Sequence, residues 1–84
     1  MNAKVLLMED DAQLSEIIKE YLEENGYDVK LATDGEEAFD MAYEEKFDIF
    51  LLDVKVPLMN GFDLLSKLRR EGNETPAILD RKSV

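Results

Sequence analysis

Short runs of consecutive apolar residues recur along the chain and predict β-strands that are buried on both faces. Residues 5–8 (VLLM) end abruptly at an acidic stretch, and residues 49–52 (IFLL) end at Asp53. A third, shorter run at residues 77–79 (AIL) follows a Thr-Pro pair and predicts a further strand. Residues 27–32 alternate apolar and polar side chains, which is typical of an edge strand with one wet face.

The segments between these runs carry apolar residues at helical spacing, so we predict helices at residues 11–25, 36–45 and 62–70. Asn25 and Gly26 form a stop signal for the first helix, and basic residues close the third near its negative pole. At this spacing the apolar side chains are expected to be core: Leu14, Ile17, Ile18, Tyr21 and Leu22 in the first helix, Ala38, Phe39, Ala42 and Tyr43 in the second, and Phe62, Leu64, Leu65 and Leu68 in the third.

The order of predicted elements is β-α-β-α-β-α-β, with connections of only a few residues. Such connections require parallel strands joined by right-handed helical crossovers. Eighty-four residues suit one small domain, so residues 1–84 are taken as a single unit. The predicted fold is a flavodoxin-like, three-layer αβα arrangement whose parallel sheet has the strand order 2-1-3-4.

Charge narrows the range of partners. The 20 acidic and 10 basic residues give a formal net charge of −10, which repels nucleic-acid phosphates and anionic lipid surfaces. We therefore expect no direct binding to nucleic acid or membrane. The chain has no cysteine, which excludes disulfides and zinc–thiolate sites, and no apolar run reaches membrane-spanning length. A cytoplasmic location is the expectation.

Acidic side chains follow two strands that should be neighbours. In the predicted strand order the first and third strands lie side by side, so Glu9 and Asp10 should meet Asp53 at the carboxyl edge of the sheet. Like charges so close repel one another unless a cation neutralises them. Ligands that are all oxygen, without His or Cys, favour a hard cation, and Mg²⁺ suits a site with few carboxylates and a phosphate oxygen.

Asp53 is our candidate for the acceptor of a phosphoryl group. Transfer of a phosphoryl group that is already loosened by Mg²⁺ depends mainly on positioning and charge neutralisation, so a carboxylate can serve as the nucleophile. At the tip of its strand, Asp53 is open to an incoming donor. Glu9 and Asp10 are better placed to hold the metal or its waters. An acidic pair after a strand is common in so acidic a chain, and the joint placement of both groups carries the prediction.

These residues closely resemble the bacterial response-regulator receiver family of two-component signalling. The resemblance runs from the KVLLMEDD stretch at residues 4–11, through DVKVPLMNG at residues 53–61, to the Thr-Pro pair at residues 75–76. It implies that Glu9, Asp10, Asp53 and the backbone carbonyl of Lys55 bind Mg²⁺. It also implies that Asp53 accepts phosphate from a histidine kinase in a phosphorelay that regulates transcription.

The sequence departs from the family pattern near its end. The family has Ser or Thr at the tip of the fourth strand, about where Arg81 stands, and a Lys at the tip of a fifth strand. By this resemblance the chain is a truncated receiver that lacks the fifth strand and last helices, and phosphotransfer should be impaired. Self-phosphorylation on Asp53 is the most activity expected, so the chain is not expected to be an enzyme.

Truncation would leave the strand at residues 77–79 as an apolar edge, from which we expect a homodimer that pairs through this edge or the adjoining apolar face. A second reading follows, in which the chain is a non-catalytic fragment that acts only by self-association. A calcium-binding protein is a poor alternative, because no segment carries the ligand spacing and central Gly of an EF-hand.

Overall fold

The structure, a computed structural model, describes residues 2–54 and 59–80. Strands and helices alternate along the chain as the hydrophobic pattern predicts. Their bounds are β1 (Lys4–Met8), α1 (Ala12–Glu24), β2 (Asp28–Ala32), α2 (Gly35–Glu44), β3 (Ile49–Asp53), α3 (Gly61–Arg70) and β4 (Ala77–Asp80). Among the helices of these residues, none is both long enough and apolar enough to cross a lipid bilayer.

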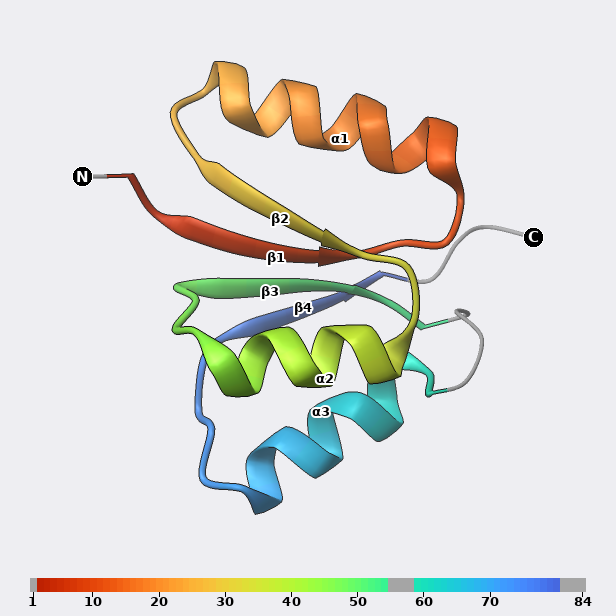
Figure 1. The fold of residues 1–84 in the computed structure, drawn as a ribbon, viewed down its shortest axis with the longest axis vertical. Coiled ribbons are helices and arrows are strands. Elements are labelled where there is room, and N and C mark those ends of the chain that lie inside the picture. Colours follow the sequence, from red (N-terminus) through yellow and green to blue (C-terminus); the bar gives the residue numbers. More distant parts are fainter. Residues whose placement is uncertain (1, 55–58, 81–84) are drawn as a thin grey trace.

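The strands form one parallel sheet in the order β2-β1-β3-β4. Helix α1 lies on one face of this sheet, and α2 and α3 lie on the other (Figure 1). The three layers and the strand order confirm the predicted flavodoxin-like fold. Because all strands run in one direction, their carboxyl ends share one edge, and each helix begins at that edge.

The hydrophobic core has two halves, one on each side of the sheet. Val5 and Leu7 of β1 face α1, whereas Leu6 and Met8 face α2 and α3, so β1 is buried on both sides. The larger half, on the α2 and α3 side, contains buried residues from the sheet, the helices and the connection before β3: Leu6, Met8, Ala32, Ala38, Ala42, Phe47, Phe50, Leu52, Leu64 and Leu68.

Side chains that accept hydrogen bonds cap all three helices at their N-termini. Asp11 accepts from the backbone N–H groups of Gln13 and Leu14, Asp34 caps α2, and Asn60 caps α3. These caps satisfy backbone donors that have no partner within the helix. The predicted stop of α1 is also present: Asn25 follows its last residue, and Gly26 has a φ of 91°, a conformation that glycine adopts at low cost.

Part of the predicted apolar helix faces is not core, which corrects the expectation from spacing. Ile17 and Tyr21 of α1 are 64% and 65% exposed, Tyr43 of α2 is 77% exposed, and Phe62 of α3 is 50% exposed. Among the described residues the sheet has four strands, and these side chains lie on parts of the helices that it leaves exposed.

The expectation that β3 is buried on both faces is also only partly met. Phe50 and Leu52 are buried beneath α2 and α3, but Ile49 and Leu51 on the α1 side are only half-buried. The reason is that α1 packs over β1 and β2. Ile78 of the neighbouring β4 is 54% exposed, so apolar surface continues across these two strands.

Two neighbouring residues of α3 provide a test of the core. Leu64 has no exposed surface, so Leu64→Ala should lower the free energy of unfolding by about 2–4 kcal/mol through the lost burial and the cavity left behind. Phe62→Ala, at a half-exposed position, should cost less than about 1 kcal/mol. Urea unfolding followed by circular dichroism measures both, and equal losses would contradict the described packing of α3.

Candidate metal centre

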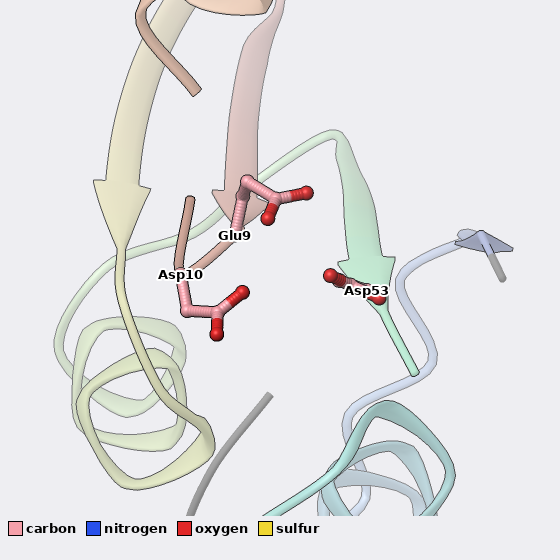
Figure 2. Close-up of side chains that lie close together, drawn as sticks. All are labelled: Glu9, Asp10 and Asp53. Carbon is pink, nitrogen blue, oxygen red and sulfur yellow. The ribbon is translucent and has the colours of Figure 1, made fainter. Parts of the chain in front are cut away.

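The pairing of β1 with β3 brings the predicted acidic residues together. Met8 lies beside Leu52 in the parallel register, so the next residues, Glu9 and Asp53, lie side by side at the carboxyl ends of β1 and β3. Figure 2 shows Glu9 and Asp10 at the end of β1 and Asp53 at the end of β3, with their carboxylates turned toward a common space. The expected convergence of these three acids is therefore confirmed.

The distances within this cluster suit a shared ion. Each residue offers one carboxylate oxygen, and these three oxygens lie within 4.8 Å of one another. Glu9 and Asp53 are 5% and 4% exposed, while Asp10 is exposed to solvent. Two of the three carboxylates are therefore buried, and the third, that of Asp10, is open to solvent. The expectation that Asp53 is open to an incoming donor is wrong for this structure, because its side chain is buried at the end of β3.

Hydrogen bonds of the β1–α1 connection fix the Glu9 side of the cluster. The backbone N–H of Glu9 donates to the carbonyl oxygen of Ala32 at 2.9 Å. One Glu9 carboxylate oxygen, Oε2, accepts from the backbone N–H of Asp11 at 3.0 Å. Because Asp11 also caps α1, the turn that carries Asp10 is held at both ends.

Asp53 is fixed through its backbone by the two elements that flank it. The residue after it, Val54, donates its N–H to the carbonyl oxygen of Asp80 in β4 at 3.0 Å. Gly61, at the start of α3, approaches so closely that a Cβ there would lie 3.0 Å from the Asp53 carbonyl oxygen. Both contacts hold the end of β3 in place beneath the acidic cluster.

Asp80 is an acidic residue of this edge that the sequence did not single out. It lies beside Asp53 in the register of β3 and β4, and its side chain is exposed. Glu9, Asp53 and Asp80 line one hollow of about 200 Å³, together with Ile18, Leu51 and Ile78 on its apolar side. The sequence signal was an acid directly after the apolar run at residues 77–79, the same signal that identified Glu9 and Asp53.

The donor set fits Mg²⁺ chemically. Three carboxylates and no nitrogen or sulfur donor form a site for a hard cation, and Mg²⁺ typically takes few protein carboxylates while it keeps several waters. Two further sets of predicted positions lie outside the described residues. These are Lys55 with its predicted carbonyl ligand, and two positions of the family comparison, Pro57 of the DVKVPLMNG motif and Arg81, where the family has Ser or Thr.

Comparison with known proteins identifies the same residues as a family domain. The model of the response regulator receiver domain matches residues 5–79. The transcriptional regulatory protein CpxR of Escherichia coli is 43% identical over 76 residues, which cover 90% of this chain and 32% of CpxR. CrdR of Helicobacter pylori is 44% identical over 71 residues, covering 84% of this chain and 33% of CrdR. The chain thus spans about a third of the length of these curated relatives.

Solved structures agree with this assignment. The receiver domain of the Francisella response regulator 1452 superposes with a TM-score of 0.93 at 35% identity, covering 99% of this chain and 70% of that one. The response regulator TrrA of Thermotoga maritima was solved in complex with Mg²⁺-BeF and superposes with a TM-score of 0.90 at 27% identity. The match covers 96% of this chain and 70% of the TrrA chain. From its fold, its acidic cluster and these matches, the chain belongs to the response regulator receiver domain family.

Proposed function

We propose that this chain is the phosphoacceptor of a two-component phosphorelay, with Asp53 as the residue that a histidine kinase phosphorylates. The observation that carries the proposal is the meeting of the carboxylate oxygens of Glu9, Asp10 and Asp53 within 4.8 Å at the carboxyl edge of the sheet. In open parallel sheets this edge is where ligands bind. We further propose that residues 1–84 act as one domain, in the cytoplasm, within a regulator of transcription.

The three acids divide between two tasks in the proposed transfer, metal binding and phosphoryl acceptance. Glu9 and Asp10 hold a divalent cation, for which we propose Mg²⁺, and Lys55 contributes its backbone carbonyl. The bound cation would neutralise the negative charge of the phosphoryl oxygens. An oxygen of Asp53 forms the new bond to phosphorus while the bond from phosphorus to the donor nitrogen breaks.

Burial prepares Asp53 for this role. With 4% exposure, the Asp53 side chain is buried among its neighbours and has few conformations to lose when a donor arrives. Receiver domains are signalling modules that take up the group rather than enzymes that release a product. We therefore propose that the phosphorylated chain itself is the output of the reaction.

The effect of removing the Asp10 charge on the free energy of unfolding should depend on whether Mg²⁺ is present. In metal-free buffer, Asp10→Asn should raise the free energy of unfolding, because it relieves repulsion by Glu9 and Asp53. On wild-type protein, Mg²⁺ at ten times its dissociation constant should add about 1.4 kcal/mol, since it binds only the folded state. Most of that gain should be lost in Asp10→Asn.

Asp40→Asn, at an exposed position of α2, is the matched control and should respond to Mg²⁺ as the wild type does. Thermal or urea unfolding at several Mg²⁺ concentrations provides the measurement. An Asp10→Asn variant with the full wild-type response to Mg²⁺ would exclude Asp10 as a ligand.

Phosphorylation gives the direct test of the proposed function. Incubation with acetyl phosphate and Mg²⁺ should add one phosphoryl group, detected as a mass increase of the intact protein. The adduct should be absent without Mg²⁺ and absent in Asp53→Asn, because the amide has no anionic oxygen to attack phosphorus. Asp40→Asn should be phosphorylated normally, and an adduct that persists in Asp53→Asn would assign the acceptor elsewhere.

A homodimer is a separate proposal, supported by the open side of β4. Within the described residues β4 pairs only with β3, and its Ile78 is 54% exposed beside the half-buried Leu51. An apolar strand edge of this kind readily pairs with another strand. We propose that a second copy of the chain covers it, so that two four-stranded sheets join edge to edge.

Sedimentation velocity over a range of concentrations tests this assembly. The wild type should form dimers, and Ile78→Lys should be monomeric, because a charge on the edge opposes strand pairing. Tyr43→Lys changes an exposed residue of α2, on the opposite face of the sheet, and should still dimerise. A wild-type protein that is monomeric at every concentration would refute the proposal.

A further inference from the structure

Gly35, the first residue of α2, touches the segment that leads from β3 into α3. A Cβ built on Gly35 would fall within 3.0 Å of the carbonyl oxygen, the carbonyl carbon and the Cβ of Met59. Real Cβ atoms essentially never approach other atoms so closely. Gly35 does not have a positive φ, as Gly26 and Gly72 do, so what requires glycine here is space and not backbone conformation.

The α2 side of this contact is held firmly. Asp34 caps the helix by accepting the backbone N–H of Glu37 at 2.8 Å. In return, a carboxylate oxygen of Glu37 accepts the backbone N–H of Thr33 at 2.7 Å. This reciprocal arrangement resembles a capping box and fixes the first turn of α2. A side chain added at Gly35 would therefore displace Met59 more readily than the helix.

The two connections that meet at this contact each hold one half of the acidic cluster. On one side, the carbonyl oxygen of Ala32, the last residue of β2, accepts the N–H of Glu9 at 2.9 Å where the connection to α2 begins. On the other, Met59 lies two residues before Gly61, which packs on the carbonyl oxygen of Asp53. The contact between Gly35 and Met59 thus links the connection that follows β2 to the connection that carries Gly61 against Asp53.

We propose that Gly35 is a positioning residue of the metal centre: its missing side chain lets the backbone of Met59 lie against α2, which keeps Asp53 within reach of the ion that Glu9 and Asp10 bind. Gly35 touches neither the ion nor the phosphoryl group. The inference rests on the proposed function, because it concerns the same metal site.

The test is to measure the Mg²⁺ affinity of the Gly35→Ala variant by NMR titration. The dissociation constant should rise about tenfold or more, as is typical when a partner that orients metal ligands is lost. Ala42→Gly is the matched control, because it lies in the same helix, is buried in the same core and weakens the helix without touching Met59. Its Mg²⁺ affinity should equal that of the wild type even though its stability falls.

A second readout needs no metal. In the Mg²⁺-free protein, the backbone amide signals of Asp53, Val54 and Gly61 should shift in Gly35→Ala and should keep their positions in Ala42→Gly. Wild-type affinity together with wild-type amide positions in Gly35→Ala would overturn the inference. A wild-type protein that binds no Mg²⁺ would instead contradict the proposed function, while the metal-free spectra would still decide the role of Gly35.

If Gly35→Ala does not fold, Met59→Gly tests the contact from its other side. This change adds no atoms, and it frees the backbone that Gly35 accommodates, so a folded protein with several-fold weaker Mg²⁺ binding is expected. Met59→Gly with wild-type affinity and wild-type amide positions for Asp53 and Gly61 would overturn the inference.

Discussion

The parallel pairing of β1 with β3 is the constraint on which the rest of this structure depends. It joins segments more than forty residues apart, and it leaves Glu9 and Asp53 side by side where the two strands end. Their carboxylate oxygens and that of Asp10 lie within 4.8 Å of one another, so like charges on them would repel. The core beneath these strand ends must outweigh that repulsion, and a divalent cation would relieve it.

The same topology provides partial compensation without any ion. Parallel strands joined by helical crossovers bring the N-termini of α1, α2 and α3 to the edge that carries the acids (Figure 1). The N-terminus of a helix bears partial positive charge, which favours nearby carboxylates. The edge that brings the acidic side chains together is thus also the edge where the helix N-termini favour negative charge. In this way the fold makes a metal site possible.

Much of this architecture could be predicted from the sequence because burial on both faces leaves a clear pattern. The apolar runs at residues 5–8 and 49–52 identified the two central strands, and the acids directly after them identified the cluster. The exposure of Ile17 and Tyr21 could not be predicted in the same way. Helical periodicity shows which side of a helix is apolar, whereas the width of the sheet beneath decides how much of that side is covered.

Two features of the site depend on contacts between distant segments. Asp80 lies beside Asp53 only because of the register between β3 and β4, which a short apolar run does not specify. The need for glycine at position 35 arises from Met59, which lies in a different connection. Glu9, Asp10 and Asp53 could be identified from the sequence, whereas Asp80 and Gly35 become apparent only from contacts between distant segments.

The most direct test of the central claim is a crystal structure of the protein grown with Mn²⁺, an ion that can replace Mg²⁺ in oxygen sites and is located by its anomalous scattering. We expect one anomalous peak at the carboxyl edge of the sheet, with carboxylate oxygens of Asp10 and Asp53 as ligands and Glu9 bound to the ion directly or through water. A crystal without a peak between these residues, or with their carboxylates turned apart, would contradict it.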